Sequence, residues 1–371
     1  MSQVRPLETA DIPAVAGLFQ RVFRNSDAPP PAALTAYLAR HYLEAPGRDP
    51  EIRPLVHVSG DGDISGFIGV NALPMSHDGR KLRAAICGSL MVERRGSDPM
   101  AGARLLKTFL AGPQDLSFSE TASEVSAQMW TRLRGVALPE YSLDWVRIIR
   151  PSAFMMELAS SRVGAVRLLS PLAGVIDRRL RGRMQENDLR WSGVPESWAV
   201  KGGLKVAEID QAGFAALVEP LTRQFALRPD WNAEQLAHIV AEATGKPEHG
   251  EAVLASVSTP GGMPIGAFLY HLRPGGIARV LQILTAPGQA GPVIDCLIGH
   301  AAQRGAAGLR GRTQPALLGA MLGRRIAFTH LASTVVHARE QALVDAFLAG
   351  QGFFNGMAGE SWSRLVGGRF E

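Results

Sequence analysis

Acidic side chains follow two strand-like runs in the first half of the sequence. Glu93 comes directly after ICGSLMV, and Glu120 comes directly after LSFS. A carboxylate next to a reacting amine or hydroxyl group can accept its proton, so either residue could act as a general base. The alternative for each is an exposed acid or a charge at a helix start. The sequence has no Ser/His/Asp or Cys/His arrangement in recognisable context, which favours direct transfer over a covalent enzyme intermediate.

Basic residues cluster at a second place in the sequence. Arg178, Arg179, Arg181 and Arg183 lie within IDRRLRGRMQ and could attract phosphate groups. The same run could be the solvated end of a helix, or it could make peripheral contact with an anionic membrane surface. The net charge is only +5, and aromatic residues are not interleaved with the basic ones. The sequence therefore gives no strong nucleic-acid signal.

Length and composition predict two globular domains. The chain has 371 residues, of which 46% are hydrophobic and 20% are charged, enough apolar area for two cores of usual size. The N-terminus lacks the features of a secretory signal, and no uncharged apolar stretch could form a transmembrane segment, so we expect a cytoplasmic protein. Cys87 and Cys296 lie far apart without zinc-motif spacing. We expect both to be buried, and we expect no metal site.

The first 150 residues begin with a strand and a helix. Val4–Leu7 forms a short alternating run, and Thr9 or Asp11 can cap the amphipathic helix that follows. The elements expected next are a helix over 32–43, a hairpin turning at 60–62, a strand over 81–92, a helix over 100–110, a strand over 116–120, a helix over 125–133 and a strand over 141–149. The first half should therefore close on its own last strand.

The same order of elements begins again after a polar stretch. The expected elements are a strand over 204–209, helices over 212–225 and 231–243, a hairpin over 251–272, a strand over 278–285, a helix over 292–304, a strand over 308–313, a helix over 315–324, a strand over 331–338 and a helix over 341–349. Asp230 could cap the second of these helices. We therefore expect an N-terminal domain over 1–150, a helical Arg-rich connector over 151–203 and a C-terminal domain over 204–371.

Several segments, taken in order, resemble the GNAT superfamily of acyl-CoA-dependent acyltransferases. They are VRPLETADIPAVAGLF, ICGSLMVERRGSDPMAGARLLKTFL and YSLDWVRII. The second half resembles a more divergent copy, so the whole chain is similar to tandem GNAT proteins, some of which are related to the FemABX aminoacyl-transfer proteins. The resemblance implies an α/β (α+β) fold of two tandem domains, each with a mixed, mostly antiparallel sheet flanked by helices. It also implies acetyl-CoA or another acyl-CoA as the co-substrate.

The resemblance assigns a cofactor site to the strand near residue 90. In GNAT domains this strand separates from its neighbour and pairs with the pantetheine arm, and the following loop and helix N-terminus bind the pyrophosphate. The cofactor-binding residues implied here are Leu90, Met91, Val92, Arg94, Arg95, Gly96, Gly102 and Ala103. A base commonly sits in the family where Glu93 follows this strand, and Glu120 follows the strand on the other wall of the cleft.

The sequence departs from the family pattern in three respects. Ser97–Pro99 interrupts the usual loop spacing, and Asp98 adds a negative charge near the expected phosphate. Thr131 stands where family members often carry the Tyr that protonates the leaving thiolate, so Tyr141 is the nearest phenol for a general acid. The corresponding loop of the second half contains no Arg or Lys, and we interpret that half as supporting or acceptor-binding.

The sequence leaves three functions open. The leading one is an acyl-CoA-dependent acyltransferase of the N-acetyltransferase type, which moves an acyl group by direct attack to an unidentified amine or hydroxyl acceptor. The second is a catalytically silent tandem module that binds or acts as a scaffold, which the degenerate loop favours. The third is a FemABX-like transferase that uses aminoacyl-tRNA, with phosphate contacts from the connector arginines.

Overall fold

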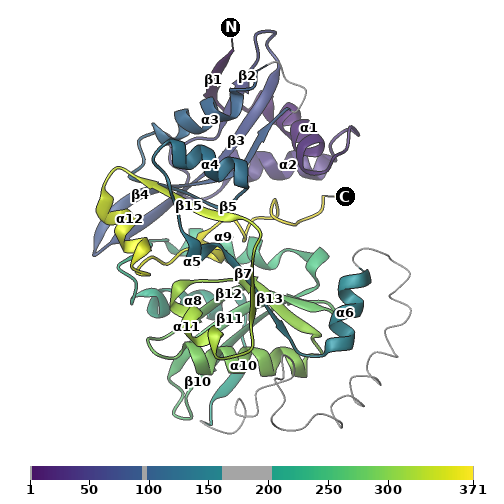
Figure 1. Ribbon diagram of the computed structural model, residues 1–371, viewed down its shortest axis with the longest axis vertical. Coiled ribbons are helices and arrows are strands. Elements are labelled where there is room, and N and C mark those ends of the chain that lie inside the picture. Colours follow the sequence, from purple (N-terminus) through teal and green to yellow (C-terminus); the bar gives the residue numbers. More distant parts are fainter. Residues whose placement is uncertain (1, 94–97, 161–202, 371) are drawn as a thin grey trace.

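The computed structural model describes residues 2–93, 98–160 and 203–370. Two β-sheets flanked by helices lie one above the other in Figure 1, and the last segment of the chain, in yellow, runs between them. The structure therefore confirms the predicted fold class, with two mixed sheets flanked by helices. The Arg-rich run at 178–183 lies outside the described residues.

The first sheet is built mainly from the first half of the chain. Its order is β1–β2–β3–β4–β5–β15–β6, with β9 paired to β3. The strands are β1 (Gln3–Pro6), β2 (Leu55–Val58), β3 (Ile64–His77), β4 (Arg80–Val92), β5 (Leu116–Ala122), β6 (Val136–Ala137), β9 (Leu227–Pro229) and β15 (Ser333–Ala338). One face packs on α1 (Ile12–Phe23) and α2 (Ala32–Ala39), and the other on α3 (Ala101–Leu110) and α4 (Glu124–Arg132).

The second sheet repeats this plan. Its order is β14–β7–β13–β12–β11–β10–β8. The strands are β7 (Leu143–Ile148), β8 (Lys205–Glu208), β10 (Glu251–Ser258), β11 (Pro264–Leu272), β12 (Ile277–Thr285), β13 (Gly308–Arg312) and β14 (Ala327–His330). One face packs on α8 (Gln211–Thr222) and α9 (Ala233–Thr244), and the other on α10 (Ala290–Gln303) and α11 (Pro315–Leu322). The described residues also form α5 (Pro139–Ser142), α6 (Pro151–Ser160) and α12 (Gln341–Leu348).

Local sequence explains how the helices begin and what they bury. In α1, Leu18 and Phe19 lie on the apolar face that the sequence predicted, and both are buried. Helix α9 begins at a capping box, in which the Asn232 side chain accepts from the Gln235 N–H at 2.8 Å and the Gln235 side chain accepts from the Asn232 N–H at 3.0 Å. The prediction that Asp230 caps this helix was wrong. The cap is Asn232, two residues later, because Asn232 and Gln235 can bond to each other's backbone N–H groups.

The two sheets exchange strands. Strand β7, in the stretch expected to close the first half, pairs instead with β13 and β14 of the second sheet, whereas β15 pairs with β5 and β6 of the first. Burial of apolar side chains accounts for the exchange, because Trp145 of β7 lies in the second core and Val335 and Val336 of β15 lie in the first. The division of the chain at 150 and 203 stays a prediction.

The strand exchange predicts that neither half folds alone. If the chain is divided after residue 202, the fragment 1–202 lacks β15, which leaves the edge of β5 without its partner. We expect each fragment alone to be aggregated or to lack cooperative unfolding by circular dichroism, and the two fragments expressed together to restore it. Cooperative unfolding of fragment 1–202 by itself would contradict this prediction.

Two further expectations concern membranes and cysteines. Within residues 2–93, 98–160 and 203–370, no helix is both long and apolar enough to cross a membrane. Cys87 and Cys296 are free thiols in the two cores, buried as the sequence predicted. Burial raises the pKa of Cys296 to about 11, so this thiol serves as a packing group.

Candidate active site

The parallel strands β4 and β5 pair only near the start of β5 and then separate. Ala84–Ile86 pairs with Leu116–Phe118, and no further pairing joins these two strands, although they continue to Val92 and Ala122. Strands β12 and β13 of the second sheet pair in parallel over three residues. The first sheet thus opens between its two parallel strands beyond Ile86 and Phe118, which is the geometry that the GNAT resemblance predicts for binding the cofactor arm.

A β-bulge lies on the β4 side of the first opening. The register between β3 and β4 shifts between Phe67 and Gly69, and Ser89 takes a left-handed conformation with φ of 54°. The buried Tyr42 hydroxyl lies under the bulge and interacts with Ser89. A Cβ at Gly69 would lie only 2.1 Å from the Tyr42 Oη, so only glycine fits there. The bulge is therefore built into the packing beneath it.

The predicted cofactor residues that the structure describes gather at the end of β4 and the start of α3. Leu90 is half-buried against the α3 and α4 core, and Met91 is buried against α1 and α2. A Cβ on Gly102 would contact the Val92 Cγ2 atom at 3.3 Å, so these two elements meet closely. Ala103 follows in the first turn of α3. Arg94, Arg95 and Gly96 lie outside the described residues.

An open groove of about 820 Å³ lies beside this meeting point. Glu93 lines it, and its carboxylate pairs with Arg21 of α1 at 2.7 Å. Asp98 lies at the start of α3, where its carboxylate accepts from the Met100 N–H at 2.9 Å and from Arg104 at 2.7 Å. The bond from the Met100 N–H contributes most to lowering the pKa of Asp98. The predicted anion site thus already carries an acid of this chain.

The opening between β4 and β5 is filled by an acid from the end of the chain. Glu360 is 8% exposed, and its carboxylate accepts from the Ser119 hydroxyl at 2.8 Å and the Glu120 N–H at 2.6 Å. It also accepts from the Thr121 N–H at 3.3 Å and the Thr121 hydroxyl at 2.8 Å. Across the opening, the point that a Cβ of Gly88 would occupy lies 3.3 Å from Oε2 of Glu360. Glu360 thus spans the opening from β5 to β4.

The predicted base Glu120 holds this terminal segment in place. Its buried side chain accepts from the backbone N–H groups of Gly356 at 3.2 Å, Glu360 at 2.7 Å and Ser361 at 3.0 Å. The two glutamates therefore make reciprocal contacts, since the carboxylate of each binds backbone N–H groups next to the other. Both oxygens of Glu120 are occupied by donors from its own chain. A base role for Glu120 stays a prediction.

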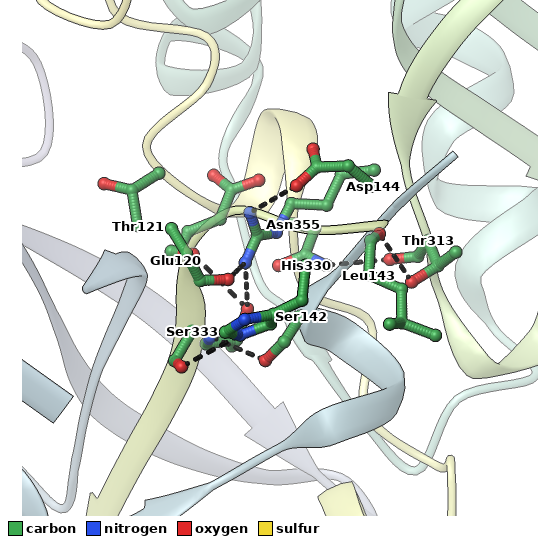
Figure 2. A network of polar contacts seen from close by, with 12 residues as sticks. Glu120, Thr121, Ser142, Leu143, Asp144, Thr313, His330, Ser333 and Asn355 are labelled. Carbon is green, nitrogen blue, oxygen red and sulfur yellow. Dashed lines mark hydrogen bonds and ion pairs between the residues drawn. The ribbon is translucent and has the colours of Figure 1, made fainter. Parts of the chain in front are cut away.

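Tyr141, the predicted acid, lies at the junction where the strands cross between the sheets. Its hydroxyl is buried and donates to the Gly352 carbonyl at 2.7 Å, and burial raises its pKa far above the usual range. Figure 2 shows Glu120 close to Asn355 at this junction. The Asn355 amide donates to the carbonyls of Tyr141 at 2.9 Å and Thr313 at 2.8 Å. The structure therefore brings Tyr141 and Glu120 to one network but places Glu93 in the groove.

A small cavity of about 50 Å³ lies between β3 and α9, next to the terminal segment. Trp231 Nε1 and His238 Nε2 belong to residues that line it, and both atoms are buried without a hydrogen-bond partner among the described residues. Beside it, His41 Nε2 lies 3.0 Å from the Asn71 amide, and burial lowers the pKa of His41 to about 3. Buried polar atoms without partners indicate a bound molecule or water.

Comparisons with known proteins support the fold and go no further. No protein-family model matches the sequence, and no curated protein matches it. A probable N-acyltransferase from Enterococcus faecalis has a similar structure, with a TM-score of 0.59 and 9% identity over 91% of this chain and 73% of that one. GCN5-related N-acetyltransferases from Anabaena variabilis and Kribbella flavida give TM-scores of 0.58 and 0.51, with identities of 10% and 12%. The match to the Anabaena variabilis protein covers 92% of this chain and 74% of that one, and the match to the Kribbella flavida protein covers 91% and 71%.

The chain thus has the fold of GCN5-related N-acetyltransferases, as the resemblance predicted. At these identities the likeness establishes the fold alone. Sequence analysis missed Glu360 because the glycine-rich segment around it has neither helical nor strand periodicity. It also missed Tyr42, whose contact with Ser89 depends on the bulge and has no local signature.

Proposed function

We propose that the protein is an acyl-CoA-dependent acyltransferase of the N-acetyltransferase type. The observation that carries the proposal is the separation of β4 from β5 beside the groove at the start of α3. Backbone groups that leave the sheet at this point can pair with an extended amide chain, such as the pantetheine arm of CoA. The similar structures, whose names include N-acetyltransferases, have the same fold and support this choice.

In the proposed reaction, an amine or hydroxyl acceptor attacks the thioester carbonyl directly. The new C–N or C–O bond forms, the C–S bond breaks, and the electron pair of that bond leaves with sulfur. The proton of the acceptor passes to a base of the protein, and the thiolate takes a proton from an acid or from water. Backbone N–H groups at the β4 bulge, around Ser89, would stabilise the oxyanion that forms at the carbonyl.

Of the acid–base residues predicted from sequence, Glu93 alone lines the groove. Its pairing with Arg21 holds the carboxylate beside α1, near the predicted phosphate end of the groove. Glu120 and Tyr141 are buried beneath the terminal segment, and their roles as base and acid stay predictions. The small cavity between β3 and α9 offers a place for one end of an acceptor. A cytoplasmic location also remains a prediction.

Calorimetric titration with acetyl-CoA tests the proposed cofactor site. We expect micromolar binding to the wild type and at least tenfold weaker binding to Gly102→Glu, because the new side chain would start 3.3 Å from Val92 and add a negative charge beside the predicted phosphate. Gly319→Glu is the matched control, since a Cβ at this helical glycine of α11 meets nothing within 4 Å. Equal binding by all three proteins would contradict the assigned site.

A second candidate function is the silent module. The terminal segment favours it, because Glu360 already satisfies backbone N–H groups of β5 inside the opening. A silent module would bind neither acetyl-CoA nor longer acyl-CoAs, so the same titration separates the two functions. The aminoacyl-tRNA alternative depends on the Arg-rich connector, which lies outside the described residues.

A further inference from the structure

Glu360 differs from the other acids of the first half because it lies inside the opening between β4 and β5. Glu360 belongs to a terminal segment that lies more than 200 residues after β5 in the sequence. Contacts of Glu120, Lys246 and Asn355 hold this segment between the two sheets. The Lys246 ammonium group donates to the carbonyls of Ser361 at 2.5 Å and Ser363 at 2.7 Å. The side chain of Glu360 is therefore positioned from both halves of the protein.

The two carboxylate oxygens of Glu360 have different surroundings. Oε1 accepts from three donors of β5, namely the Ser119 hydroxyl, the Glu120 N–H and the Thr121 N–H. Oε2 accepts from the Thr121 hydroxyl and faces β4 at Gly88, where it lies 3.3 Å from the point that a Cβ would occupy. Oε2 has a single donor against the three of Oε1, so it keeps capacity for a further hydrogen bond. The free position is directed toward the β4 wall of the opening.

The groups facing Glu360 disfavour its charged form. Its burial is the main reason why the pKa of its carboxyl group is raised, and the charge of Glu120 on β5 adds to the effect. Cys87 on β4 and Tyr42 beneath the bulge also interact with Glu360, and burial keeps both of them neutral. A carboxylate with a raised pKa holds an accepted proton better than an exposed one does.

We propose that Oε2 of Glu360 is the atom that accepts the proton of the attacking acceptor. This inference rests on the proposed acyltransferase function. The acceptor nitrogen bonds to the thioester carbonyl carbon, its proton moves to Oε2, and the C–S bond breaks with its electron pair on sulfur. The protonated Glu360 then returns the proton to the thiolate, so that CoA leaves as a thiol and the carboxylate is restored. In this arrangement Glu93 lines the cofactor groove without taking the proton, and Glu120 is a positioning residue that holds the segment carrying Glu360.

The test combines binding and transfer in the intact chain, with hydroxylamine as a small acceptor. Acetyl-CoA affinity is measured by calorimetry, and the rate of acetohydroxamate formation is measured against pH with correction for the free-base fraction of hydroxylamine. We expect Glu360→Gln to bind acetyl-CoA within threefold of the wild type but to transfer the acetyl group about 10²- to 10⁴-fold more slowly. The wild-type rate should rise with pH through a pKa above the ordinary glutamate range, and this limb should vanish in Glu360→Gln.

The possible results separate this inference from the proposed function. If acetyl-CoA binds but the wild type transfers no faster than buffer, or if Glu360→Gln keeps the wild-type rate and pH profile, the inference is overturned and the cofactor site stands. If Glu93→Gln, and not Glu360→Gln, abolishes the rise of the rate with pH, then Glu93 is the base and the inference is overturned. Absence of acetyl-CoA binding to the wild type overturns the proposed function itself. If Glu360→Gln fails to fold, Glu360→Asp takes its place: slower transfer with a shifted pH limb supports the inference, and an unchanged rate and limb overturns it.

Discussion

Replacement of Glu120 by alanine is expected to lower the free energy of unfolding by about 3 to 5 kcal/mol. The substitution removes the acceptor of three backbone N–H groups in the terminal segment, and hydrogen bonds to a charged acceptor contribute about 1.5 to 3 kcal/mol each without being strictly additive. Buried N–H donors that lose their partner add to the loss, because water does not reach them. Urea denaturation at pH 7 measures the change.

Glu124→Ala is the control for this prediction. Glu124 lies in the exposed first turn of α4, so its removal should change the free energy of unfolding by less than about 1 kcal/mol. Glu120→Gln should fall between the two, because the amide keeps one acceptor oxygen. A change below 1 kcal/mol in Glu120→Ala would show that the terminal segment does not depend on this carboxylate.

Acid is expected to destabilise the protein strongly between pH 6.5 and pH 4.5. Burial lowers the pKa of His41 and of His249 to about 3 and that of His271 to about 4, whereas unfolded histidine titrates near 6.5. The unfolded chain therefore binds protons first as the pH falls through 6.5, and the stability present above that pH is progressively lost. Since one pKa unit corresponds to about 1.4 kcal/mol, three histidines across two pH units give a loss of up to about 8 kcal/mol by pH 4.5.

The pH effect can be assigned by substitution. Glu360 acts in the opposite sense, because its raised pKa favours protonation in the folded state, but a single carboxyl group offsets only part of the loss. Urea denaturation at several pH values measures the slope, and His41→Gln should reduce it in the window from 6.5 to 4.5. A free energy of unfolding that is flat across this window would contradict the neutral buried state of these three histidines.

The order of elements could be predicted from sequence because it depends on local patterns. The apolar face of α1 and the strand ending at Val92 are both visible as periodic runs, and both are present in the structure. The similar order of the two halves likewise indicated two sheets. These features need only neighbouring residues, so one sequence is enough to recognise them.

The strand exchange and the terminal segment could not be predicted in the same way. The alternation that makes Trp145 and Val335 face a core is the same whichever sheet receives the strand, so periodicity does not decide the partner. The contact between Glu120 and Glu360 joins positions that only the complete fold brings together. Glu120 could be singled out from the sequence because it follows a strand, whereas nothing in the local sequence marked Glu360.

Hydrogen exchange with and without acetyl-CoA tests the central claim most directly, namely that the opening in the first sheet binds the thioester. The account predicts slower amide exchange in peptides that contain Gly88–Val92 and the first turn of α3, with no change in peptides from β12 and β13. Unchanged exchange along β4, or protection confined to the second sheet, would contradict the account.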